Sequence, residues 1–99
     1  MSLSPAAVAD DNPSVTACFS VHAHAEPGVM PRVLEVFAKR GLVPSAWHSA
    51  THGTDQAELT IDIQMCGLGR DLMDYLAACL RQIAYVEVVL TTEQRSLPG

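Results

Sequence analysis

Apolar residues alternate with polar or small ones in three segments of the chain. The apolar positions of the first segment are Val15, Ala17, Phe19, Val21 and Ala23. Those of the other two are Ala57, Leu59, Ile61, Ile63 and Met65, and then Val86, Val88 and Leu90. A period of two is typical of a strand with one buried face. The pattern therefore predicts strands over residues 15–24, 57–65 and 86–91.

Two other segments repeat their apolar residues at helical spacing. The first begins after Glu26-Pro27-Gly28 and continues to Gly41, a residue type that favours a left-handed helix end. Its apolar positions are Val29, Met30, Val33, Leu34 and Phe37. The second follows Gly67-Leu68-Gly69 and has its apolar positions at Leu72, Met73, Leu76, Cys79, Leu80 and Ile83. Helices are predicted over residues 29–40 and 70–83.

Segment 42–51 predicts a strand less clearly, because Pro44 cannot donate a hydrogen bond to a sheet. Such a strand belongs at a sheet edge, and residues 52–55 supply turn chemistry after it. Residues 45–51 contain no charged side chain unless His48 is protonated. Because an uncharged free edge can pair with another chain, we expect a homodimer whose interface includes Trp47 and Ser49.

The resulting order of elements is βαββαβ. Two right-handed βαβ crossovers place both helices on one face of an antiparallel sheet, with the strands in the order 4-1-3-2. The expected fold class is therefore an α+β, ferredoxin-like sandwich. We expect one domain over residues 15–92, a disordered lead-in over 1–14 and a polar tail over 93–99.

Composition excludes several classes of function. The 99 residues are 48% hydrophobic, and six Lys and Arg stand against eleven Asp and Glu, for a formal net charge of −5. This balance argues against binding to nucleic acid. RNA-recognition modules share the βαββαβ order, but they stack bases on aromatic side chains of the sheet. Segment 57–65 has no aromatic residue, so this function is excluded as well. Without a long apolar run or a signal peptide, the chain is expected in the cytoplasm and away from membranes.

Neither a metal site nor a reaction centre is expected. Three cysteines without CxxC spacing do not indicate a zinc site or a disulfide framework. His22 and His24 share a strand face, with Asp62 on a neighbouring strand, but His48 and His52 lie on a distant edge. No GxSxG motif or pair of catalytic carboxylates is present. We therefore expect a protein that is not an enzyme and requires no cofactor.

The turn before the first helix is the best candidate site. Glu26-Pro27-Gly28-Val29 presents backbone N–H groups at a helix N terminus, where the helix dipole favours a carboxylate. The alternative is a purely structural turn that needs glycine for steric reasons. The residue types alone leave both interpretations open.

Residues 26–41 read EPGVMPRVLEVFAKRG, and residues 80–88 read LRQIAYVEV. The first run resembles the first-helix signature of ACT domains, in particular those of the small subunits of acetohydroxyacid (acetolactate) synthase. The second is similar to the passage from the second helix to the last strand in the same subunits. The resemblance covers residues 15–92 and is strongest to the short isozyme II type.

This resemblance implies a regulatory subunit of acetolactate synthase in branched-chain amino-acid biosynthesis. ACT domains pair side by side and bind an amino acid between the first strand-to-helix loop and the partner copy. The corresponding ligand-binding positions are Ala25, Glu26, Gly28, Val29, Met30 and Val43. Relatives that bind an effector carry Asn or Asp at the position of Ala25 and often Asn at that of Val43, so weak binding or none is expected. A stand-alone amino-acid-sensing dimer without an enzyme partner is the alternative.

Overall fold

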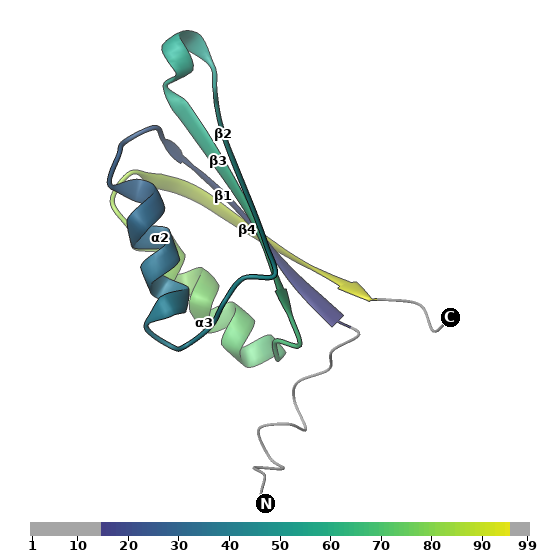
Figure 1. Ribbon diagram of the computed structural model, residues 1–99. Helices are drawn as coiled ribbons and strands as arrows, with labels where there is room; N and C mark the ends of the chain where they lie inside the picture. The colour runs from purple at the N-terminus through teal and green to yellow at the C-terminus, as the bar shows by residue number, and fades with distance from the viewer. Residues whose placement is uncertain (1–14, 96–99) are drawn as a thin grey trace, which may run out of the picture.

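The computed structural model describes residues 15–95 (Figure 1). The lead-in predicted for residues 1–14 and the last part of the predicted tail lie outside these residues. The elements are, in order, β1 (Val15–His24), α2 (Val29–Ala38), β2 (Ala46–His52), a 3-10 turn η1 (Thr54–Gln56), β3 (Glu58–Cys66), α3 (Arg70–Arg81) and β4 (Val86–Arg95). This is the βαββαβ order that the sequence predicts.

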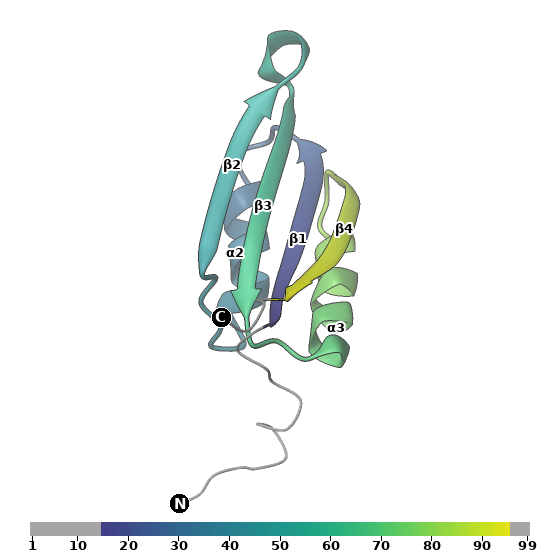
Figure 2. The same cartoon turned by 90° about the vertical axis from the view of Figure 1, so that its right-hand side faces the viewer.

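The four strands form one antiparallel sheet in the order β2-β3-β1-β4. Read from the β4 edge, this is the predicted order 4-1-3-2, which is confirmed. Figure 2 shows the sheet face on, with both helices behind it, α2 on the side of β2 and α3 on the side of β4. The ferredoxin-like α+β fold is therefore confirmed as well.

The core lies between the sheet and the helices. Alternate residues of β1 and β3 point into it, as the period of two requires. The largest fully buried side chains are Phe19, Phe37, Ile61, Ile63, Leu76, Leu80, Val21, Val29 and Val33. The rings of Phe19 and Phe37 meet edge to face with their centroids 5.5 Å apart, an arrangement that aromatic pairs favour. This contact joins the C-terminal end of α2 to β1.

The strand bounds differ most from the prediction at the start of β2 and the end of β4, while β3 is shifted by one residue at each end. β2 begins at Ala46, after Pro44, and the preceding Ser45 donates its backbone N–H to the carbonyl of Gln64 at 2.8 Å. β4 continues to Arg95, so the prediction of a strand that ends near residue 91 was too short. The polar residues of this strand end stay in register with β1, Glu93 opposite Ala17 and Arg95 opposite Val15. Burial alternates along β4 in the phase opposite to the predicted one, since Val89 is buried whereas Val88 and Leu90 are 44% and 55% exposed.

Both helices are a little shorter than predicted. α2 ends at Ala38, and Gly41 then adopts the expected left-handed conformation with φ of 70°. α3 ends at Arg81. Within residues 15–95, no helix has the length and apolar character needed to cross a membrane.

Candidate functional site

The loop between β1 and α2 is held at one end of the sheet by its neighbours on both sides. The backbone N–H of Ala25 donates to the carbonyl of Ala57 at 2.9 Å, next to β3. The N–H of His24 donates to the carbonyl of Tyr85 at 3.0 Å, just before β4. These bonds fix the direction in which the chain enters α2. Ala25 itself packs against the core, whereas Glu26 is exposed.

Fewer backbone donors are free at the start of α2 than the sequence predicts. The N–H of Val29 donates to the carbonyl of Glu26 at 3.1 Å, so Val29 was wrongly counted as an available donor. Pro31 has no N–H to offer. The N–H groups of Gly28 and Met30 donate to no partner within residues 15–95. These two groups form a donor pair at the positive end of the helix dipole.

Gly28 is not required by its backbone conformation. Its φ of −79° and ψ of −6° are accessible to any residue. A Cβ atom at this position would instead collide with the guanidinium of Arg32, which donates from Nη1 to the Gly28 carbonyl at 3.1 Å. Backbone strain therefore does not explain the glycine at this residue. The guanidinium is the exposed, flexible end of its side chain, so it can shift to admit a Cβ atom.

Arg32 is the site residue that the sequence analysis missed. It brings a positive charge to the same loop as the free N–H groups of Gly28 and Met30. The signal was present in the sequence, because a basic residue four positions after the N-cap reaches back over the first helical turn. No acidic residue stands in that turn of α2 to neutralise it.

The structure does not bring Val43 to this loop within one chain. Val43 is 84% exposed and follows the C terminus of α2, whereas Gly28 precedes its N terminus. A helix of ten residues separates them, and its length is about 15 Å. Any site that includes both residues needs the Val43 of a second copy.

The free edge of β2 lies on the flank of α2 that faces away from α3. β2 pairs with β3, and its other edge pairs with no strand of the described chain. Trp47 and Ser49 lie opposite Ile63 and Ile61, so their side chains share the helix-covered face and are half-buried. The surface that a second copy would meet is therefore the main-chain edge, with Trp47 and Ser49 just inside it.

Apolar side chains extend this surface onto α2. Met30 and Leu34 are 39% and 46% exposed and stand one turn apart. They lie on the opposite flank of the helix from Arg32 and Glu35, which face α3. We call the combination of Met30, Leu34 and the free edge of β2 the β2 flank.

The four histidines lie along the open face of the sheet. His24 Nε2 lies 3.1 Å from a carboxylate oxygen of Glu87, and His52 Nδ1 lies 3.9 Å from one of Glu58. His22 shares a hydrogen bond of 3.2 Å with Ser20 Oγ. In the part of the chain that the structure describes, no three His, Cys, Asp or Glu residues converge as metal ligands.

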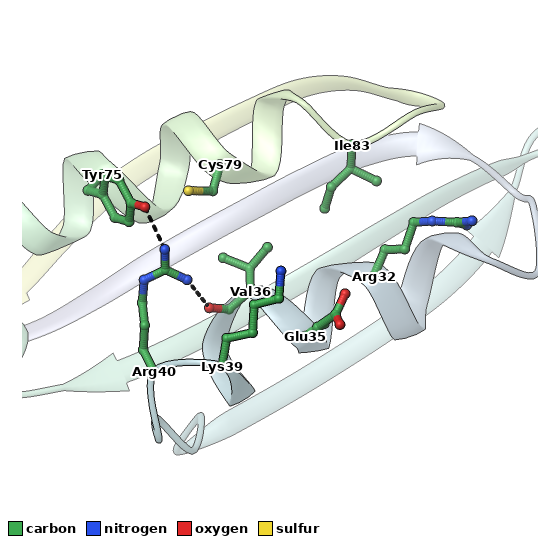
Figure 3. Close-up of a pocket in the computed structure, with 8 residues that line it drawn as sticks. All are labelled: Arg32, Glu35, Val36, Lys39, Arg40, Tyr75, Cys79 and Ile83. Atoms are coloured by element: carbon green, nitrogen blue, oxygen red, sulfur yellow. Dashed lines mark hydrogen bonds between the residues drawn. The ribbon is translucent and has the colours of Figure 1, made fainter.

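A hollow that the sequence did not predict lies between the two helices (Figure 3). It encloses about 390 Å³ and is lined by Arg32, Glu35, Val36, Lys39, Arg40, Tyr75, Cys79 and Ile83. Arg40 reaches across it from the end of α2 and donates to the hydroxyl of Tyr75 on α3 at 2.6 Å. We call this hollow the interhelical groove.

Known structures share the fold of this chain. The ACT domain of GTP pyrophosphokinase from Chlorobium tepidum is similar with a TM-score of 0.64 and 16% identity, over 78% of this chain and 96% of that one. The C-terminal domain of the MgtC protein from Mycobacterium tuberculosis gives 0.62 and 17%, over 86% and 93%. The regulatory subunit of aspartate kinase from Thermus thermophilus gives 0.62 and 10%, over 82% and 52%. At such identities the likeness concerns the fold alone.

The sequence comparison is more specific. No curated protein matches the chain. Residues 10–97 match the profile of the ACT-like domain, which confirms the resemblance to ACT domains; the narrower resemblance to an acetolactate synthase subunit stays a proposal. Because the match spans nearly the whole sequence and the sheet order agrees with it, the chain belongs to the ACT-like domain family.

Proposed function

We propose that this chain is a cytoplasmic, non-catalytic regulatory module that acts as a homodimer and binds a small amino acid at the β1–α2 loop. ACT domains are typically regulatory and sense amino acids. The observation that carries the proposal is the combination of the free N–H groups of Gly28 and Met30 with the guanidinium of Arg32. Donors grouped at a helix N terminus beside a cation suit a carboxylate.

The same loop explains why the affinity should be weak. The α-amino group of an amino acid needs an acceptor, and Ala25 offers no side-chain oxygen. Glu26 is the acidic residue of the loop, but it is exposed and screened by solvent. The effector is therefore held mainly through its carboxylate, and the rest of the pocket has to come from a second copy.

A two-fold dimer through the β2 flank supplies that second wall. Antiparallel pairing of two β2 edges reverses the direction of the second copy. Val43, which precedes β2 at one end of the sheet, then approaches the other copy's β1–α2 loop at the opposite end. The same pairing buries the exposed Met30 and Leu34 side chains. This arrangement is how Val43 contributes to the ligand site.

The proposed enzyme partner is the catalytic subunit of acetolactate synthase. The support for this choice is the resemblance of residues 26–41 and 80–88 to the small subunits of that enzyme. Co-elution with the catalytic subunit of the same organism, together with a change in its activity, is the expected result. If the two proteins elute separately and the activity is unchanged, the stand-alone amino-acid-sensing dimer is the better description.

Calorimetric titration with branched-chain and other neutral amino acids tests the effector site. We expect weak binding that falls at least fivefold in Arg32→Gln, since that variant loses the cation beside Gly28. Arg95→Gln removes the same charge at the end of β4 and should change the affinity less than twofold. Equal affinities in the parent and Arg32→Gln, or no binding of any amino acid, would contradict the proposed effector site.

A further inference from the structure

The interhelical groove concentrates positive charge in an acidic protein. Three of the six Lys and Arg residues of the sequence line it, namely Arg32, Lys39 and Arg40. One acidic residue, Glu35, lines it among the described residues. The lining therefore carries a net charge of plus two in a chain whose formal charge is −5. A local field of this sign attracts anions.

These three cations take part in none of the ion pairs found among residues 15–95. Within residues 15–95, none of them has a carboxylate oxygen within 4.0 Å. The ion pairs of the described chain lie elsewhere, for example between Arg70 and Glu93. Cations gathered on one groove repel one another, and a bound anion would relieve that repulsion.

Arg40 is held in position by two hydrogen bonds and a contact with an aromatic ring. Its Nη1 donates to the carbonyl of Val36 at 3.0 Å, and its Nη2 donates to the hydroxyl of Tyr75 at 2.6 Å (Figure 3). The guanidinium carbon lies 4.6 Å from the centre of the Tyr75 ring, within cation–π range. Two of its hydrogen-bonding nitrogens are thus anchored, while further N–H groups of the fork stay available. A ligand meets a donor that is already ordered, which lowers the cost of binding.

The floor of the groove is apolar. Val36, Cys79 and Ile83 are half-buried between the helices, and Tyr75 forms the wall on the side of α3. The volume of about 390 Å³ is within the range of small-molecule sites. An occupant therefore has an apolar portion as well as a charge.

We propose that the interhelical groove binds a phosphate monoester that carries an apolar or aromatic group. A phosphate monoester bears about −1.5 to −2 charges at neutral pH, which matches the two cations Lys39 and Arg40 at one end of the groove, whereas a monocarboxylate compensates only one of them. The fork of Arg40 and the ammonium of Lys39 are the donor types that bind phosphoryl oxygens. The apolar group lies against Val36, Ile83 and the Tyr75 ring. The site is centred on Lys39 and Arg40, which follow the opposite end of α2 from the effector loop. Arg32 lines the groove as well, but its guanidinium belongs to that loop, where it binds the Gly28 carbonyl.

Phenyl phosphate is a suitable probe, titrated into the ¹⁵N-labelled full chain and followed by amide chemical shifts at low ionic strength. We expect saturable shifts at Val36, Lys39, Tyr75 and Cys79. Inorganic phosphate, which lacks the ring, and benzoate, which carries a single charge, should each bind at least fivefold more weakly. Benzoate that binds as tightly as phenyl phosphate would overturn the assignment, as would shifts confined to residues 25–30.

Variants separate a built site from general electrostatic attraction. Arg40→Gln and Lys39→Gln should each weaken phenyl phosphate at least tenfold. Arg95→Gln, which removes the same charge from β4, should change the affinity less than twofold. If all three variants weaken binding equally, the groove is not the site. Neutral amino acids should bind the parent and Arg40→Gln with equal affinity. Failure of the phosphate-binding proposal can therefore be distinguished from failure of the proposed effector site.

Discussion

The guanidinium of Arg32 occupies the space that a side chain at residue 28 would need. Its Nη1 donates to the Gly28 carbonyl at 3.1 Å and would collide with any Cβ built on that residue. The backbone of Gly28 is ordinary, with φ of −79°. The backbone conformation of residue 28 is therefore compatible with a larger side chain. The observed position of Arg32 is not.

Gly28→Ala should weaken effector binding without unfolding the protein. The added methyl displaces Arg32, which can move because its side chain is long and exposed. Replacing an N-cap glycine by alanine costs about 1 kcal/mol of unfolding free energy or less. Calorimetry should show at least a threefold loss of affinity, checked beside chemical denaturation of the same variant.

Gly41→Ala is the matched control at the other end of α2. No atom lies within 4 Å of a Cβ there, but φ is +70°. Strain in a left-handed conformation costs roughly 1–2 kcal/mol. This variant should lose stability and keep its effector affinity. The reverse pattern in the two glycine variants would contradict the role given to Arg32.

Ala25→Asn should strengthen effector binding. The new side-chain oxygen lies at the start of the β1–α2 loop and can accept from the α-amino group of the ligand. A hydrogen bond to a charged group contributes about 1.5–3 kcal/mol at best. Calorimetric titration measures the gain, with Ala38→Asn at the far end of α2 as the control. An unchanged affinity would mean that the loop does not bind the amino group.

Leu34→Glu should dissociate the homodimer. Leu34 is 46% exposed on the β2 flank, and a charge there would be buried against the second copy. Leu90→Glu is the matched control, because Leu90 is 55% exposed on β4, away from that flank. Sedimentation velocity at tens of micromolar, a range that detects ordinary interfaces, distinguishes them. A monomeric parent, or a dimer that survives Leu34→Glu, would refute the proposed interface.

The ion pair of Arg70 and Glu93 should make the free energy of unfolding depend on pH in the acidic range. The hydrogen bond from Arg70 lowers the pKa of Glu93 below its usual value. A carboxyl whose pKa is lower in the folded state adds stability above its unfolded pKa and loses it as the pH falls. The unfolding free energies of the parent and Arg70→Gln should therefore differ at pH 7, and the difference should shrink as the pH falls below the ordinary pKa of a glutamate and through the lowered pKa of Glu93. Arg32→Gln, with no carboxylate partner in the described chain, should show no such convergence.

The sequence by itself determined the order of elements and the topology of the sheet. Alternation in β1 and β3 is unambiguous because a strand with one buried face must place every second side chain in the core. Pro44 and the uncharged residues after it were enough to place β2 at an edge. The same reasoning stopped β4 too early, because Glu93 and Arg95 join the sheet through backbone hydrogen bonds to β1, which side-chain polarity does not report.

Only the tertiary structure decided which donors are free and which side chains meet. The N–H of Val29 donates to the carbonyl of Glu26 because of the local path of the chain. Arg32 reaches the Gly28 carbonyl because of its side-chain rotamer. The interhelical groove depends on α2 and α3 packing side by side, which joins Arg40 to Tyr75 across 35 positions of sequence. Periodicity identifies the buried face of each helix. It contains no information on which exposed residues of two distant helices face each other, because packing of both helices against the sheet decides that.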